Sequence, residues 1–390
     1  MEINKTWNQH TIKKENKFLV LQNIRRNNPA SRAEISNITG LNKGTVSSLV
    51  NELLEEKLIK EAGSGESKGG RRPVMLLFNK NAGNSIGIDL GVNYILGILT
   101  DLEGNIIEKK QTKFYNPTYK QILAKLFQII DSLYLSSSNT PYGIVGIGIG
   151  VPGIVEKNQN ILLTPNLKWG ETNLKETLKK KYDTAIIIEN EANAGVYGEK
   201  KFGTGKNNKN IVYVSVGIGI GVGLILNDTL YRGSEGFSGE LGHMTIEMNG
   251  KTCSCQNQGC WELYASEKSL LSEAQKAHIQ LPQKKELVLE HLVKLAETGD
   301  RKTIQLFNDI GRYLGMGINN IINIFNPEIV IIGNRMKLAK NWIENPINDW
   351  VNNKTLWFNK KELNISFSEV FTSSTALGAV ALTIENFINS

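Results

Sequence analysis

Four residues with metal-binding side chains lie close together in the second half of the sequence: His243, Cys253, Cys255 and Cys260. They include all 3 cysteines of the chain, which fall within eight residues. Three thiolates and one imidazole are the four ligands of a closed tetrahedral zinc site. Because no coordination position is left for water, we predict a structural Zn²⁺ ion that folds a loop. The alternative is a group of buried cysteines without a metal.

Carboxylate and amide side chains flank this cluster and recur earlier in the chain. Glu240 lies three residues before His243, and Glu262 lies two residues after Cys260. A second group follows an expected strand and consists of Glu189, Asn190, Glu191 and Asn193. Sugar hydroxyls are bound by short acceptors together with amides, which both donate and accept hydrogen bonds. The set is therefore compatible with a sugar site, although any one of these residues alone is equally typical of a surface helix start.

The segments that must position these residues repeat one pattern. Apolar strands are expected at 85–91, 94–100, 144–151 and 185–189, with an amphipathic helix near 119–134. A glycine-rich hairpin follows at 211–225, and after further helices a strand spans 328–332. This strand-hairpin-then-helix plan occurs twice, which predicts two α/β lobes around a cleft. Glycines at strand ends would let a ligand approach the backbone closely.

The first 80 residues have a different pattern, with three expected helices. The second helix begins at Ser31, whose spacing from Glu34 is that of a capping box. Its apolar face is expected to consist of Ala33, Ile35 and Ile38. Asn42 can cap the third helix, in which the apolar residues at 46, 49, 50, 53 and 54 form one stripe for burial.

The polar side of the third helix is typical of a DNA recognition helix, since its short or flexible donors can reach base edges in the major groove. Two strands expected at 58–62 and 73–78 would form the hairpin of a winged helix, with a basic tip for phosphates. The predicted DNA-binding residues are Ser31, Arg32, Asn42, Lys43, Thr45, Ser47, Ser48, Arg71 and Arg72. The alternative is an ordinary helical hairpin followed by a flexible Gly/Ser linker.

The net charge of +7 is concentrated in the same part of the chain. Residues 1–80 carry a net charge of +6, and the other 310 residues carry +1. This indicates a small basic head for an anionic partner and a nearly neutral body. No apolar run approaches the ~20 residues needed to span a bilayer, and the polar N-terminus has no signal-peptide core. With 3 cysteines the chain is not a disulfide scaffold, so we expect a cytoplasmic protein without a membrane partner.

The body resembles the ROK family (repressors, open reading frames and sugar kinases) over about residues 81–390. The resemblance lies in the segment from Gly217 to Leu224 and in the glycines that follow it, Gly233, Gly236, Gly239 and Gly242. It implies an α/β fold of the two-lobed actin-like ATPase type. The segments 87–96 and 188–198 are most similar to the xylose-responsive repressors of that family.

The resemblance also implies domain boundaries. A winged helix-turn-helix domain is expected at 1–80 and a ROK sugar-binding domain at 81–390. Within the latter, lobe 1 is expected at about 81–197 together with the C-terminal helix, and lobe 2 at about 198–373. The expected fold class is therefore α/β, with an N-terminal winged helix-turn-helix and a sugar-kinase-like body.

Roles for single residues follow from the same resemblance. The implied sugar contacts are Asn190, Glu191, Glu240, His243 and Glu262. The family has the four zinc ligands at this spacing, with Gln256 here in place of its usual glycine. Its phosphate loop reads Asp-x-Gly-Gly-Thr, where this chain has Asp89-Leu90-Gly91-Val92-Asn93, and Glu191 stands in place of its catalytic Asp. Since a displacement of about 1 Å can cost ~10²-fold in rate, the resemblance implies a sugar site without catalysis, and no catalytic residue is assigned.

Three functional hypotheses remain. The favoured one is a repressor that binds operator double-stranded DNA as a homodimer and is released by a sugar inducer, D-xylose. The second is an active sugar kinase with an added DNA-binding head. The third is a zinc-sensing regulator with a vestigial cleft. The predicted sugar carboxylates favour the first over the third, and the altered phosphate loop favours the first over the second.

Overall fold

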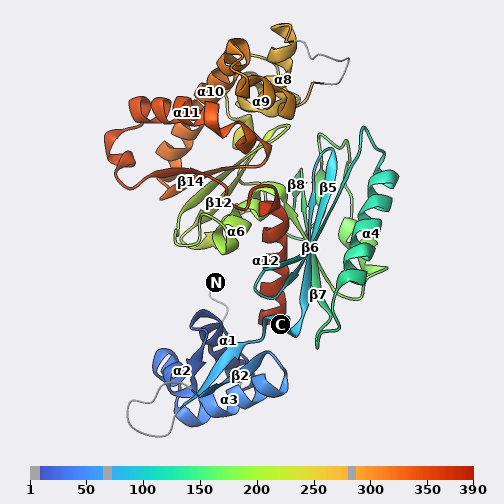
Figure 1. The fold of residues 1–390 in the computed structure, drawn as a ribbon, viewed down its shortest axis with the longest axis vertical. Helices are drawn as coiled ribbons and strands as arrows, with labels where there is room; N and C mark the ends of the chain where they lie inside the picture. The colour runs from blue at the N-terminus through green and yellow to red at the C-terminus, as the bar shows by residue number, and fades with distance from the viewer. Residues whose placement is uncertain (1–8, 65–72, 280–286) are drawn as a thin grey trace.

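A computed structural model describes residues 9–64, 73–279 and 287–390 of the chain. The described residues form a small N-terminal head (9–64 and 73–78) and a larger body (79–279 and 287–390). Figure 1 shows the head below a body that contains two sheets, with the last helix running from the middle of the body down to the head. Helix α1 of the head and the C-terminal end of the last helix therefore lie on the same side of the body (Figure 1).

The head has three helices, α1 (Gln9–Arg26), α2 (Arg32–Thr39) and α3 (Lys43–Glu55), and the antiparallel sheet β1-β3-β2 (β1, Ala30–Ser31; β2, Ile59–Ser64; β3, Val74–Phe78). The capping box at Ser31 and Glu34 is present, and Asn42 caps α3 by accepting from the Thr45 N–H at 2.8 Å. Gly40 takes φ 71 between α2 and α3, a conformation that favours glycine. This is the predicted arrangement of a winged helix.

Two parts of the expected head core differ from the structure. On α2 only Ile35 of the three expected apolar residues is buried, whereas Ala33 is exposed and Ile38 is 54% exposed. The reason is that α2 is only eight residues long and buries only Ile35 and Ser36. On α3 the expected stripe is buried except at Leu54, which is half-buried near the end of the helix.

The first sheet of the body has the order β10-β7-β4-β5-β6 (β4, Asn84–Leu90; β5, Tyr94–Asp101; β6, Ile106–Lys113; β7, Ile144–Val151; β10, Ala185–Asn190). Strands β4, β7 and β10 are parallel, and β5 and β6 continue the sheet as an antiparallel meander. Helix α4 (Tyr119–Ser136) covers one face and α12 (Ser374–Asn389) the other (Figure 1). Short elements complete this part: η1 (Lys80–Ala82), β8 (Ile154–Val155), β9 (Ile161–Leu163) and α5 (Leu174–Lys179).

The second sheet repeats the plan in the order β13-β12-β11-β14-β15 (β11, Ile211–Val216; β12, Ile220–Leu226; β13, Thr229–Leu230; β14, Ile329–Gly333; β15, Asn364–Phe367). Here too an antiparallel hairpin is joined to parallel strands. The helices of this part are α7 (Glu262–Ala265), α8 (Glu267–Lys276), α9 (Leu289–Glu297), α10 (Arg301–Phe325) and α11 (Lys340–Lys354). Its 3₁₀ turns are η2 (Leu241–His243), η3 (Arg335–Ala339), η4 (Trp357–Lys360) and η5 (Phe371–Ser373).

Helix α6 (Glu191–Phe202) lies between the two sheets and packs along α12. The two helices cross with their backbones in contact, which requires glycine at the crossing. A Cβ placed on Gly378 of α12 would lie 1.7 Å from the carbonyl oxygen of Ala194, and one on Gly198 of α6 would lie 2.1 Å from that of Ser374. The pair therefore forms one tightly packed unit.

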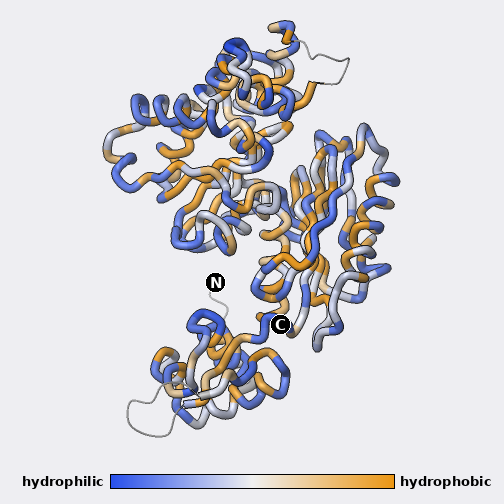
Figure 2. The backbone as a smooth tube through the Cα atoms, viewed as in Figure 1, coloured by the Kyte–Doolittle hydropathy of each residue, from blue (hydrophilic) through white to orange (hydrophobic). Residues whose placement is uncertain are grey.

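The inner strands β7 and β11 are almost entirely apolar, whereas the edge strand β6 is mostly polar, and Figure 2 shows the corresponding orange and blue stretches. One hydrophobic cluster crosses from the head into the body. It contains Ile24 and Leu53 of the head together with Val380 and Ile384 of α12, all at most 1% exposed. Within the three described ranges, no helix has the length and apolarity required to cross a membrane.

Candidate functional site

A cleft of about 370 Å³ lies between the two sheets of the body. Its walls come from the loop after β4, the loop after β7, the N-terminus of α6, the β11–β12 hairpin and the loop that carries the cysteines. All five residues predicted to contact a sugar line it: Asn190, Glu191, Glu240, His243 and Glu262. A second hollow of about 600 Å³ has different walls and contains none of these five.

Asn190 holds the cleft wall together through both ends of its side chain. Its Oδ1 accepts from the backbone N–H groups of Ala192 (2.8 Å) and Asn193 (3.1 Å), which caps α6. Its Nδ2 donates to the carbonyl oxygen of Gly153 at 2.8 Å and so ties down the loop after β7. An amide nitrogen carries two hydrogens, so one donor is left for a ligand.

Glu191 is held by two residues that the sequence reasoning missed. Its Oε1 accepts from Ser215 Oγ at 2.9 Å and from Asn334 Nδ2 at 2.8 Å, both in the second sheet region. Burial raises the pKa of Glu191, and the hydrogen bonds from Ser215 and Asn334 oppose that rise. A signal was present in the sequence, because Ser215 interrupts the apolar run of β11 and Asn334 follows a strand end.

Glu189 and Asn193, grouped with these residues in the sequence, do not share their surroundings. Glu189 is 6% exposed and pairs with Arg232, whose Nε donates to Glu189 Oε2 at 2.8 Å. The Asn193 side chain donates to the other carboxylate oxygen of Glu189 at 3.2 Å. Successive residues of a strand point to opposite faces, so Glu189 and Asn190 lie on different sides of β10.

The glycine-rich hairpin allows a carboxylate to lie against its backbone. A Cβ on Gly219 would be 2.7 Å from Glu262 Oε2, so only glycine leaves the Glu262 side chain in its present position at the cleft. Glu262 begins α7, directly after the cysteine loop. The hairpin and the cysteine loop therefore place this carboxylate together.

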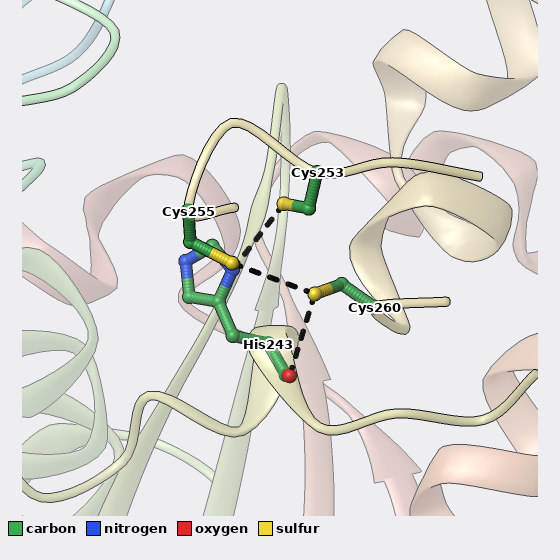
Figure 3. A group of neighbouring side chains, drawn as sticks. All are labelled: His243, Cys253, Cys255 and Cys260. Atoms are coloured by element: carbon green, nitrogen blue, oxygen red, sulfur yellow. Dashed lines mark hydrogen bonds between the residues drawn. The ribbon is translucent and has the colours of Figure 1, made fainter. Parts of the chain in front are cut away.

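The four predicted metal ligands meet at one point beside the cleft (Figure 3). Their ligand atoms all lie within 4.8 Å of one another. The sulfurs of Cys255 and Cys260 are 3.6 Å apart, and Cys253 Sγ lies 3.6 Å from His243 Nδ1. Sulfurs on one tetrahedral zinc lie about 3.8 Å apart when each Zn–S bond is about 2.3 Å. The cluster therefore has the donor set and the spacing of a tetrahedral metal site.

The loop between the cysteines contains a residue in the left-handed region. Gln256 has φ 72, and its N–H donates to the carbonyl oxygen of Cys253 at 3.0 Å. This conformation costs a non-glycine residue about 1–2 kcal/mol. This turn explains why glycine is the favoured residue at this position. The same turn forms here although the residue is Gln256.

The polar half of α3 is at the surface of the head, as predicted. Asn42, Lys43 and Ser48 are exposed, and Thr45 and Ser47 are half-buried. Ser31 requires a correction, because it is 5% exposed and its hydroxyl is taken by the capping box with Glu34. Arg32 is bound within the head, since its guanidinium donates to Asn51 Oδ1 at 3.1 Å. Arg71 and Arg72 lie outside the described residues.

Comparison with known proteins matches this architecture in both of its parts. Residues 85–386 match the ROK family and residues 14–72 match the MarR family. The chain belongs to the ROK family. The predicted fold class, an N-terminal winged helix-turn-helix followed by a sugar-kinase-like actin fold, is confirmed.

Particular relatives include repressors and kinases. The chain is 45% identical to the xylose repressor of Bacillus subtilis (strain 168) over 381 residues, 98% of each protein. It is 30% identical to a glucokinase of Streptomyces coelicolor over 280 residues, 68% of this chain and 86% of the glucokinase. The crystal structure of a ROK family transcriptional regulator, a homolog of the E. coli MLC protein, superimposes with a TM-score of 0.82 at 26% identity over 97% of both chains. A ROK family glucokinase from Streptomyces griseus, in complex with glucose and AMPPNP, gives a TM-score of 0.70 at 25% identity over 77% of this chain and 99% of its own.

Proposed function

We propose that this chain is a sugar-responsive transcriptional repressor. Its head binds operator DNA, its cleft binds an uncharged sugar, D-xylose, and sugar binding releases the DNA. The proposal is supported by the xylose repressors among its relatives, which match nearly the whole chain at up to 45% identity. The domain division is proposed as a DNA-binding domain at 1–80 and a sugar-binding domain at 81–390.

The observation that carries the proposal is the course of α6 and α12. Helix α6 begins in the cleft with Glu191 and ends at Phe202, which packs against the cluster shared with the head. Helix α12 packs on α6 and ends in the same cluster. A sugar that moves the N-terminus of α6 would therefore displace the surface on which the head rests. Coupling of this kind typically amounts to 1–3 kcal/mol, or ~5–150-fold in affinity.

In the head, α3 is the proposed recognition helix. Its N-terminal residues Asn42, Lys43, Thr45, Ser47 and Ser48 would face the major groove, and Arg71 and Arg72 of the wing would contact phosphates. Arg32 would contribute charge near the DNA backbone, whereas the hydroxyl of the buried Ser31 is engaged in the capping box. We further propose a homodimer on a palindromic operator, so that two copies of α3 enter major grooves about one helical turn, or a multiple of it, apart.

In the cleft, Glu240 and Glu262 would accept hydrogen bonds from sugar hydroxyls, and Asn190 would donate with its remaining hydrogen. Glu191 is proposed to border the sugar as a structural residue, because Ser215 and Asn334 already occupy one of its oxygens. That arrangement supports a non-enzymatic role, in which the catalytic Asp of the kinases is replaced by a glutamate whose hydrogen bonds keep it from acting as a base.

The cysteine cluster is proposed to hold one structural Zn²⁺ through His243, Cys253, Cys255 and Cys260. With His243 Nδ1 directed toward Cys253, the other ring nitrogen would be available to a sugar hydroxyl, so the metal would orient a ligand-binding residue. Cys255→Ser should remove about one zinc per chain in metal analysis, since Zn²⁺ sites of this type need four ligands, while the neighbouring Ser254→Ala should retain it. A Cys255→Ser protein with an undiminished zinc content would contradict this ligand set.

Operator titrations across a panel of sugars test the function itself. Affinity of the full chain for operator DNA should fall when D-xylose is added and should fall with salt at every sugar concentration. Glu262→Ala should bind the operator normally but lose the sugar response. Glu235→Ala, an exposed glutamate that does not line the cleft, is the matched control and should respond like the unaltered protein. Operator affinity that is unchanged by every pentose and hexose would refute the proposal.

A further inference from the structure

The half of the cleft beside Gly91 contains a side chain that the sequence reasoning did not consider. The hydroxyl of Tyr94 donates to Asp89 Oδ2 at 2.7 Å. The tyrosine ring packs on the loop, since a Cβ on Gly91 would lie 2.2 Å from its Cε1 atom. Tyr94 also lines the cleft. The ring therefore occupies the space next to the loop that resembles a phosphate loop.

One backbone N–H group of this loop is already engaged within the protein. Phosphate is held by backbone N–H groups that point into open space. Here the N–H of Gly91 donates to the carbonyl oxygen of Tyr94 at 2.9 Å and closes a tight turn. Gly91 therefore offers no free N–H to a phosphate.

The acidic residue of the loop is also closed off. Asp89 is 3% exposed, and its only described partner is the Tyr94 hydroxyl, while Oδ1 has no hydrogen-bond partner in the described structure. Burial and the nearby charge of Glu191 raise the pKa of Asp89 well above its ordinary value. A protonated carboxyl is a poor ligand for Mg²⁺, which nucleotides bring with them.

The opposite wall is filled in the same way. The side chain of Asn334 lies near Gly217, with Nδ2 3.1 Å from the place of a Cβ on that glycine. It joins Ser215, 3.0 Å away, to Glu191. These side chains thus link the N-terminus of α6 to the second sheet across the cleft.

We propose that Tyr94 is the specificity-determining residue that closes the phosphate half of the cleft, so that this site accepts a sugar and excludes nucleoside triphosphates. The inference rests on the proposed sugar-binding function. A Mg²⁺–nucleotide would have to displace the ring from Gly91 and break the bond to Asp89. Removal of the ring reopens the space that it fills, whereas removal of the hydroxyl alone does not.

The test compares the full-length protein with three variants by calorimetric titration of Mg²⁺–AMPPNP. The unaltered protein and Tyr94→Phe, which keeps the ring, should show no binding. Tyr94→Ala should bind with a Kd at least about tenfold below the detection limit set with the unaltered protein, a difference of at least about 1.4 kcal/mol. Tyr94→Thr removes the same ring with a β-branched residue that favours a strand start, so it gives the answer if the alanine variant does not fold.

Two results would overturn the inference: AMPPNP binding by the unaltered protein equal to that of the ring-deleted variants, or folded Tyr94→Ala and Tyr94→Thr proteins that gain nothing. D-Xylose is titrated in parallel. Absence of D-xylose binding by the unaltered protein would refute the proposed function. The nucleotide titrations of the variants would still decide the role of Tyr94.

Discussion

The contact between α6 and α12 can be tested by replacing Gly378 with alanine. The new methyl group would lie 1.7 Å from the carbonyl oxygen of Ala194 and 2.8 Å from the backbone nitrogen of Gly198. Since ordinary contacts begin at 3.4 Å, the two backbones would have to separate by roughly 1.7 Å. Backbone atoms cannot rotate away, so we take the upper part of the range for overpacking, about 3 kcal/mol. Alanine regains about 1 kcal/mol over glycine within a helix, which leaves a net loss of about 2 kcal/mol.

Urea denaturation followed by tryptophan fluorescence measures this loss in the free energy of unfolding. The matched control is Gly170→Ala, because a Cβ on Gly170 has no atom within 4 Å and should leave the stability unchanged. Because α6 reaches the cleft and α12 reaches the head, the Gly378 variant should also respond less to D-xylose in operator binding. Stability equal to that of the control would show that the helices do not cross at this distance, and the proposed route between the two sites would fail with it.

Three further predictions concern single residues. Because the pKa of Asp89 is raised, the folded state binds the carboxyl proton more tightly than the unfolded state, so the stability that Asp89 contributes is present at low pH and declines as pH rises through the raised value. Asp89→Asn should therefore be more stable than the unaltered protein at pH 8, with a smaller difference at pH 5. A difference in stability that is independent of pH would contradict the burial of this charge. Ser31→Ala should lower the free energy of unfolding by about 1 kcal/mol. This loss should shrink at acid pH, because Glu34, whose pKa is lowered by its hydrogen bonds to Ser31, becomes protonated there. A loss that grew at low pH would count against the capping box. Gln256→Gly should raise the thermal midpoint of the zinc-loaded protein, because the turn at φ 72 costs glutamine about 1 kcal/mol more than glycine; an unchanged or lower midpoint would place the strain elsewhere.

Features that depend on local spacing could be predicted from the sequence. The capping box needs only Ser31 and Glu34 three residues apart, and the stripe from Val46 to Leu53 needs only the helical period. The two lobes follow from strands whose apolar runs are long enough to be buried. The metal cluster was recognisable because all its cysteines fall within one loop.

Features that depend on contacts between distant residues could not be predicted. Asn334 and Glu191 are 143 positions apart, and no local sequence pattern indicates that Asn334 donates a hydrogen bond to Glu191. The position of the Tyr94 ring depends on the tightness of the turn at Gly91, which a two-strand prediction does not specify. The exposure of Ile38 depends on how little of α2 its neighbours cover. In each case the position or exposure of the side chain depends on which distant residues surround it, and the residue type alone does not determine it.

The hydrophobic cluster that joins the head to α12 has a consequence for how the protein is made. The head is synthesised well before Leu377, Val380 and Ile384 of α12, which complete its core. The N-terminal part of a chain is generally free to fold during synthesis. Here its final packing has to wait until α12 has left the ribosome. A chain that lacked α12 would therefore lack a finished head, so that only molecules containing α12 would compete for the operator.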